Sequence, residues 1–198
     1  MKRTTRMFLV TLLLPVFVTI LGGQEVTEKR DIAVFGLEYA QYKIPPTALS
    51  VVDGQIRDVF INLGRFNVIG MSYTIDTANV DQFIQKIKEV KQQNAEIPET
   101  VRLGQEAFTE ADFNRLVGSF IVVIPSVSYY QTERTDSGNY RTEIETTFTF
   151  VNVEKAETMS FFDISTSAVD ESLQDSVREA AEDIAPRLTF ELRSIPEF

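Results

Sequence analysis

The chain has 198 residues, of which 43% are hydrophobic and 24% charged, as in one globular domain with a sizeable core. Its formal net charge of −10 argues against binding to nucleic acid or to anionic lipid headgroups, since both depend on clustered Lys and Arg. The sequence has no Cys and no His, which excludes Ser-His and Cys-His catalysis, disulfides and a lipid anchor through Cys, and leaves only oxygen ligands for a metal. We therefore expect no metal, no cofactor and no enzymatic activity.

The first 23 residues have the pattern of a secretory signal. Three basic residues precede an apolar run over 7–21, and the small residues Gly22 and Gly23 follow it. The run is short for a membrane-spanning helix, which needs about 20 apolar residues, and Pro15 interrupts it. The sequence thus predicts an exported protein with a signal peptide at 1–23. An uncleaved N-terminal anchor is the alternative.

The next part of the chain alternates between predicted strands and helices. Apolar runs at 32–37 and 66–69 indicate buried strands. Residues 47–63 lie between them and carry apolar side chains at spacings of three and four, and residues 79–94 repeat this pattern after the second strand. The order is that of a βαβ unit.

The stretch 95–108 contains Pro98 and Gly104 and is predicted to be irregular. Thr109 is a candidate N-cap of a short helix that ends at Gly118.

The rest of the chain carries the clearest β pattern. We predict three strands and one long helix, at 119–132, 140–153, 159–165 and 170–192. The first two strands flank a turn cluster at 136–139 and form a long hairpin, and Pro186 should kink the helix. The whole order predicts an α/β (α+β) fold. We expect one mixed β-sheet with helices packed on it, formed by a single domain at 24–198.

Several segments, in this order and spacing, resemble a bacterial envelope family. They are Asp31–Leu37, Leu63–Ile69, Gly118–Val123, Phe148–Val153 and Glu157–Ser160. The family includes the curli secretion protein CsgG, the penicillin-binding-protein activator LpoB and the N-terminal domain of TolB, and the resemblance covers residues 31–193.

The resemblance implies this fold and a periplasmic or outer-membrane-associated location, and it does not select one function. The candidate partners are other envelope proteins and further copies of this chain in a homo-oligomer. Two departures separate the chain from particular members. It lacks the acylated Cys of CsgG and LpoB, and residues 74–104 are helical and charged, unlike the membrane hairpins of CsgG. We therefore predict a non-catalytic protein-interaction module. A pore subunit, a hydrolase that uses carboxylates alone and a small-ligand binder are the alternatives.

Tyr129, Tyr130 and Tyr140 are the candidate interaction residues, because they lie along the long hairpin and aromatic side chains are enriched at interfaces. Cross-strand packing within the hairpin is the competing interpretation. The segment 101–108 is the next candidate, since loops often carry function.

The remaining candidates for chemistry have simpler interpretations. Glu143 and Glu145 share one strand face and could work as a carboxylate pair, but they are expected on a solvated face. Asp31 and Glu38 flank the first strand and are interpreted as end caps. The glycine at 36 and the Asp53-Gly54 pair lack the spacing of a phosphate-binding loop.

Overall fold

The computed structural model describes residues 29–49, 51–195 and 198. The predicted signal peptide at 1–23 lies outside this range. Among the described helices, none is both long and apolar enough to cross a lipid bilayer.

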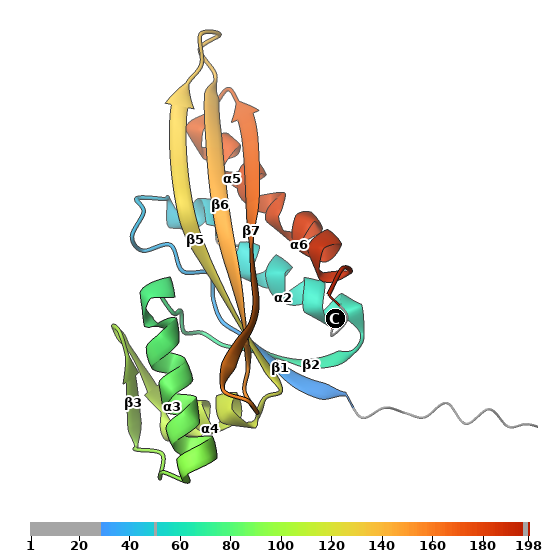
Figure 1. The fold of residues 1–198 in the computed structure, drawn as a ribbon. Helices are drawn as coiled ribbons and strands as arrows, with labels where there is room; N and C mark the ends of the chain where they lie inside the picture. The colour runs from blue at the N-terminus through green and yellow to red at the C-terminus, as the bar shows by residue number, and fades with distance from the viewer. Residues whose placement is uncertain (1–28, 50, 196–197) are drawn as a thin grey trace, which may run out of the picture.

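A five-stranded mixed sheet forms the centre of the fold, as predicted (Figure 1). The strand order is β2-β1-β5-β6-β7. The strands span Arg30–Val34 (β1), Phe66–Gly70 (β2), Ile121–Arg134 (β5), Tyr140–Asn152 (β6) and Glu157–Asp170 (β7). β1 is parallel to both neighbours, whereas β5, β6 and β7 form an antiparallel meander.

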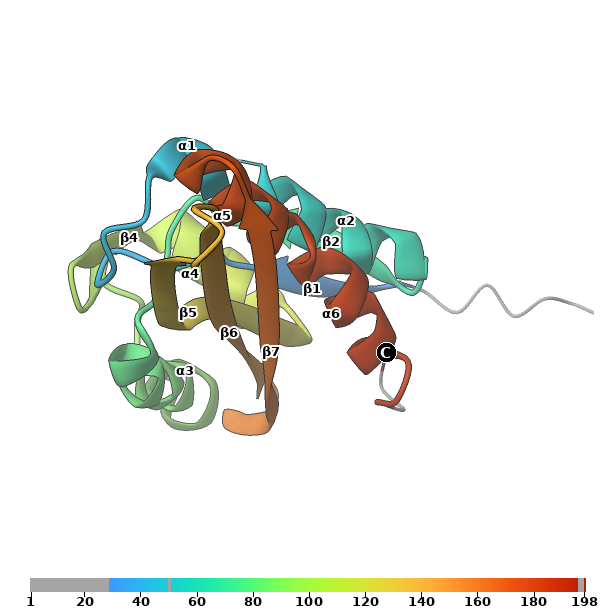
Figure 2. The same cartoon turned by 90° about the horizontal axis from the view of Figure 1, so that it is seen from above.

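Helices cover the sheet on both sides (Figure 2). On one side lie α1 (Pro46–Leu49), α2 (Val52–Leu63), α5 (Leu173–Glu182) and α6 (Ile184–Leu192). On the other side lie α3 (Val80–Gln93), α4 (Glu110–Gly118) and a small antiparallel sheet of β3 (Thr100–Leu103) and β4 (Glu106–Thr109). A 3-10 turn, η1 (Thr77–Asn79), leads into α3.

The alternation of side chains along β1 explains why its apolar run is nearly continuous. Ile32 and Val34 point into the core under α2, α5 and α6, while Ala33 and Phe35 belong to the second core under α3 and α4. A strand that is covered on both faces has no polar face, so no alternation is visible in its sequence.

The prediction of irregular structure at 95–108 holds for residues 95–99 and was wrong for 100–108. β3 and β4 form a short hairpin whose turn contains Gly104 at φ 59°. Val101, Leu103 and Phe108 are buried in the second core. Their alternation with polar residues covers only four positions a strand, which is too short a pattern to outweigh Pro98 and Gly104.

Two predicted helices are each divided in the structure. The helix expected at 47–63 consists of α1 and α2. The one expected at 170–192 consists of α5 and α6, which meet at Asp183. Pro186 lies in the first turn of α6, where its missing N–H is tolerated. It could not continue α5, because its ring would collide with the carbonyl of Glu182.

The third strand of the meander is longer than predicted. β7 continues past Ser165 to Asp170 and pairs with β6 along almost its whole length. Its last residues alternate in exposure, but the inward positions carry Thr166 and Ala168 and the apolar Val169 is exposed, so the sequence pattern there is weak.

Candidate protein-interaction surface

The meander reaches beyond the part of the sheet that α3, α4 and the small sheet cover (Figure 1). There its helix side packs on α5 and α6, and its opposite side is exposed. We call this opposite side the outer meander face. It consists of Tyr129, Gln131, Glu133, Arg141, Glu143, Glu145, Thr147, Asp163, Ser165, Ser167 and Val169.

Carboxylates are held in place on the outer meander face by neighbouring hydroxyl groups. The hydroxyls of Ser128 and Ser165 each donate to the carboxylate of Glu145 at 3.3 Å. Thr147 Oγ1 donates to Asp163 Oδ1 at 2.5 Å. The hydroxyl groups fix the carboxylates without neutralising them, so the centre of this face is an ordered, negatively charged surface.

The three candidate tyrosines do not form one patch. A β-bulge at Ser128 shifts the register between β5 and β6, and after it Tyr129 lies opposite Glu145 on the outer meander face, where it is 41% exposed. Tyr130 points to the helix side and packs 6.5 Å from the ring of Tyr42, and burial raises the pKa of its phenol. Consecutive residues of a strand face opposite sides, so the sequence itself could have separated these two residues.

Tyr140 lies at the end of the hairpin, where β6 begins. The guanidinium of Arg134 lies 5.9 Å from its ring centroid, a cross-strand pair that closes the tip. Of the three, Tyr129 alone belongs to the outer meander face.

Within the described residues, β7 pairs with β6 and leaves its other side unpaired, and we call this side the β7 edge. Residues 160–170 contain no Lys, Arg or Pro, the residues that commonly protect such edges. A long edge strand of this kind presents backbone N–H and C=O groups to which another strand can bond.

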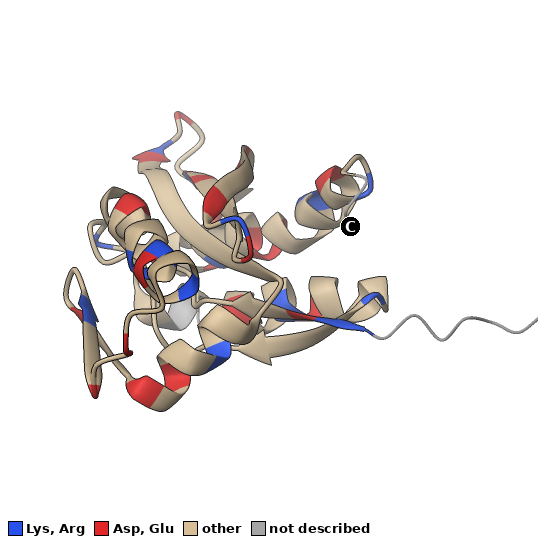
Figure 3. Ribbon diagram, turned by 60° about the horizontal axis from the view of Figure 1, so that its bottom comes forward, with Lys and Arg blue, Asp and Glu red and all other residues tan. Residues whose placement is uncertain are grey.

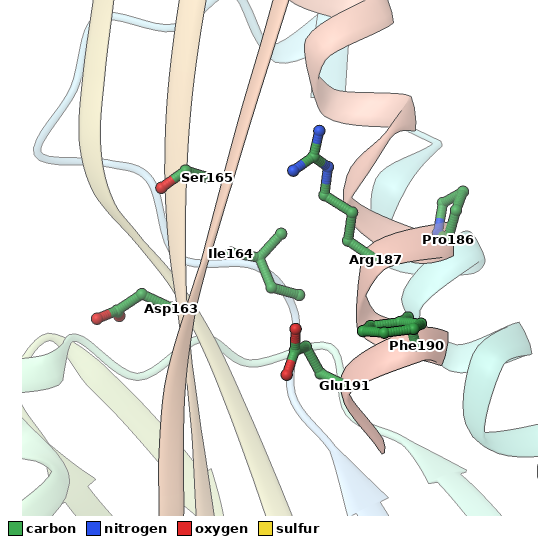
Figure 4. Close-up of a pocket in the computed structure, with 7 residues that line it drawn as sticks. All are labelled: Asp163, Ile164, Ser165, Pro186, Arg187, Phe190 and Glu191. Atoms are coloured by element: carbon green, nitrogen blue, oxygen red, sulfur yellow. The ribbon is translucent and has the colours of Figure 1, made fainter. Parts of the chain in front are cut away.

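A groove of about 410 Å³ separates the β7 edge from α6 (Figure 4). Ile164 points toward α6, and Pro186 and Phe190 line the opposite wall. Asp163 and Ser165 point to the other side of the strand. Phe190 is 72% exposed and Phe161, on β7, is 69% exposed, so two large aromatic side chains flank this edge in contact with solvent.

Arg187 lies between the groove and the outer meander face. Arg187 Nε donates to Asp183 Oδ2 at 2.7 Å, so the charge of Arg187 is balanced by the residue that precedes α6. Arg187 also lines a neighbouring hollow of about 380 Å³ with Tyr129, Glu143 and Glu145, so the groove and the outer meander face are contiguous. Elsewhere acidic and basic residues are interspersed, and basic residues mark the start of β1 (Figure 3).

The other carboxylates singled out in the sequence have structural roles. Asp31 Oδ1 accepts from Asn67 Nδ2 at 3.1 Å, and Glu38 Oε1 accepts from the backbone N–H of Ala40 at 2.6 Å. Glu143 and Glu145 lie on the exposed strand face as expected. In the part of the chain that the structure describes, no three acidic side chains gather as a metal site would require.

The segment 101–108, the second candidate, borders a polar hollow of about 360 Å³ at the carboxyl end of β1. Its turn faces Glu38, Asp76 and Thr74 across this hollow. The carboxylates there already have partners, since Asp76 Oδ1 accepts from Ala78 N–H and Glu106 accepts from the hydroxyl of Thr74. These hydrogen bonds connect the loops around the hollow. The outer meander face is therefore the stronger candidate for a protein-interaction surface.

The fold and this surface define an α/β protein in which β7 forms one of the two edges of the described sheet and the meander has a polar, exposed face. No family model and no curated protein matches the sequence. Several solved structures have a similar backbone path. The PelC dodecamer from Paraburkholderia phytofirmans is 12% identical, with 80% of this chain and 84% of that chain covered, at a TM-score of 0.42.

Two further structures are similar to the same degree. Lipoprotein GNA1162 from Neisseria meningitidis is 10% identical, with 81% of this chain and 99% of that chain covered and a TM-score of 0.42. Protein XCC0632 from Xanthomonas campestris is 10% identical, with 83% and 82% covered and a TM-score of 0.46. At these identities the likeness concerns the path of the chain.

Proposed function

We propose that the chain is an exported protein-interaction module of the bacterial cell envelope, related in type to CsgG, LpoB and the N-terminal domain of TolB. It acts by binding other proteins and carries out no catalysis. The observation that carries the proposal is the outer meander face with its adjoining β7 edge, where an ordered polar surface meets two exposed Phe side chains.

The shape of this surface supports a protein partner over a small molecule. Small-molecule sites enclose most of the ligand in a concave, mainly apolar pocket. Here the groove is bounded on one side by a strand edge and is contiguous with the exposed outer meander face, which suits a large and extended contact. Exposed aromatic side chains beside fixed polar groups are typical of the centre and rim of protein interfaces.

Export and partner contact can be tested together in cells. The full chain is expressed in a bacterium with an outer membrane, and a photoreactive phenylalanine analogue replaces Phe161 or Phe190. The control carries the analogue at Ile61, an exposed apolar residue of α2. We expect the chain in the periplasmic or outer-membrane fraction, and cross-links to envelope proteins or to a second copy from Phe161 and Phe190 alone.

Two outcomes of the same experiment would contradict the proposal. A chain that stays in the cytoplasm contradicts export, and equal cross-linking from all three positions contradicts a specific surface. Self-association belongs to the proposal as well. Sedimentation velocity on the purified chain measures it directly, and a monomer at every concentration would restrict the function to binding different proteins.

A further inference from the structure

We propose that the β7 edge receives an extended segment of a partner protein as a sixth strand of the sheet, with basic side chains on one face of that segment and apolar side chains on the other. This inference rests on the proposed function and specifies its binding mode. Three features of the edge define the partner's chemistry: its backbone, the groove beside α6 and the acidic groups of the outer meander face.

The backbone of β7 determines where an added strand could pair with the sheet. β7 has 14 residues. Its helix side packs on α5 and α6, and along its unpaired side an open groove lies between the strand and α6. An added strand would lie about 4.8 Å from β7 and bond to every second residue. The β-bulge at Met159 marks the lower limit of the regular edge, so residues 160–170 form the template.

The helix side of the added strand faces apolar groups. Ile164 points into the groove, and Pro186 and Phe190 form the far wall. A partner residue opposite Ile164 would point the same way, because neighbours across a sheet share a face. Its apolar side chain would cover Phe190, which is otherwise mostly exposed to water.

The other side of the added strand faces fixed negative charge. Partner residues next to the one opposite Ile164 lie opposite Asp163 and Ser165, and so point toward the outer meander face. There Asp163 and Glu145 are held by hydroxyl groups, with Glu143 one row further along. Arg187 is paired with Asp183, so the field on this side attracts Lys or Arg.

Charge also argues against a second copy as the occupant. The chain has a net charge of −10, and β7 itself carries acidic residues and no basic one. Two β7 edges paired with each other would bring Asp163 and its neighbours close to the same groups of the other copy, and like charges across a sheet are destabilising. The distribution of charge along this edge therefore favours a basic partner segment.

The test uses the exported chain as cells process it and a labelled peptide, acetyl-(Lys-Val)₄-amide, as the probe. Fluorescence anisotropy measures binding, and hydrogen exchange measures which amides the peptide protects. We expect slower exchange at residues 160–170 and affinity that falls as salt is added. A (Glu-Val)₄ peptide should bind about tenfold more weakly or not at all, and a (Lys-Val)₄ peptide that is N-methylated at every residue should not bind.

Variants of the protein complete the design. Phe190→Ala and Asp163→Asn each change an exposed side chain and should weaken binding about threefold to tenfold, while Ile61→Ala on α2 should leave it unchanged. Binding of the N-methylated peptide, equal affinity for the acidic peptide, or protection elsewhere would overturn the inference. Protection of 160–170 that grows with protein concentration in the absence of peptide would also overturn it, in favour of a second copy.

Failure here is distinguishable from failure of the proposed function. If the peptide does not bind while Phe161 and Phe190 still cross-link to envelope proteins in cells, the interaction module stands and strand addition is wrong.

Discussion

Phe198 places its ring 5.1 Å from the ring of Phe150 on β6, at an interplanar angle of 65°, so the residue that follows α6 packs in the main core. The rings of Phe60 and Phe66 lie 5.9 and 5.5 Å from the ring of Phe198. The guanidinium of Arg65 donates to the carbonyl of Phe198 and holds its backbone beside β2. The position is therefore part of the hydrophobic core.

We expect Phe198→Ala to lower the free energy of unfolding by about 3–5 kcal/mol, the usual cost of removing a buried Phe side chain. Chemical denaturation monitored by circular dichroism measures it. Phe190→Ala is the matched control, since Phe190 is 72% exposed, and its effect should lie within about 0.5 kcal/mol. Similar losses for both variants would show that the packing around Phe198 contributes little.

Two glycines should respond to alanine in opposite directions. Gly104 has φ 59°, and a Cβ there would lie 2.5 Å from Asn79 Nδ2, so Gly104→Ala should destabilise the protein by about 1–2 kcal/mol or more. Gly54 lies in α2, and apart from its chain neighbours and the nearby backbone of its own helix no atom lies within 4 Å of a Cβ there. Gly54→Ala should therefore stabilise the protein by about 0.4–1 kcal/mol. Thermal melting of the two variants measures whether each substitution raises or lowers the stability.

The double variant Gly104→Ala, Asn79→Ala separates the causes at the β3–β4 turn. It removes the collision and leaves the backbone strain, so it should recover part of the stability lost by Gly104→Ala. Full recovery would mean that the left-handed conformation at Gly104 costs nothing for alanine, against expectation.

Tyr129 and Tyr130 provide a third test, because adjacent strand residues face opposite sides and the bulge at Ser128 decides which of the two faces the helices. Tyr130→Ala removes a ring that packs on Tyr42 and the main core and should cost about 2–4 kcal/mol of stability. Tyr129→Ala should be close to neutral for folding and should lower partner binding. Denaturation curves measure the stability of both variants, and the cross-linking assay measures their partner binding. A larger loss of stability for Tyr129→Ala than for Tyr130→Ala would mean that the bulge lies elsewhere in the strand.

The sequence was sufficient to predict the mixed sheet, the meander and the N-cap at Thr109, whose side chain accepts from the N–H of Asp112. These elements have long periodic patterns or definite local chemistry. The β3–β4 hairpin and the core position of Phe198 were missed, because they depend on contacts between distant segments. A four-residue strand or one Phe after a helix carries no periodicity of its own.

The candidate surface could be predicted only in part. The candidate residues were predicted on the long hairpin, and in the structure Tyr129 lies on its exposed outer side. The bulge at Ser128, which decides the faces of the two adjacent tyrosines, leaves little trace in the sequence. The β7 edge and its groove beside α6 could not be predicted, because a strand becomes an edge only through the order in which the whole sheet assembles.

The stability that Asp112 contributes at the start of α4 should depend on pH. Tyr73 and Thr109 each donate a hydroxyl hydrogen bond to Asp112 Oδ2 at 2.7 Å, and these bonds lower the pKa of the Asp112 carboxyl below its ordinary value of 3.8. The same contact raises the pKa of the Tyr73 phenol. Because the folded state favours the ionised carboxylate, the stability it contributes is present above the ordinary pKa and is lost as the pH falls through the lowered one.

Asp112→Asn should therefore be less stable than the unchanged protein near pH 7, and the difference should shrink as the pH falls below 3.8. Urea denaturation at a series of pH values between 2 and 7 measures the difference. Glu110→Gln serves as the control, since Glu110 lies in the same first turn of α4 with an exposed side chain and shares the favourable position near the helix N-terminus. If both variants show the same dependence on pH, the helix dipole accounts for the effect and the hydrogen bonds from Tyr73 and Thr109 do not.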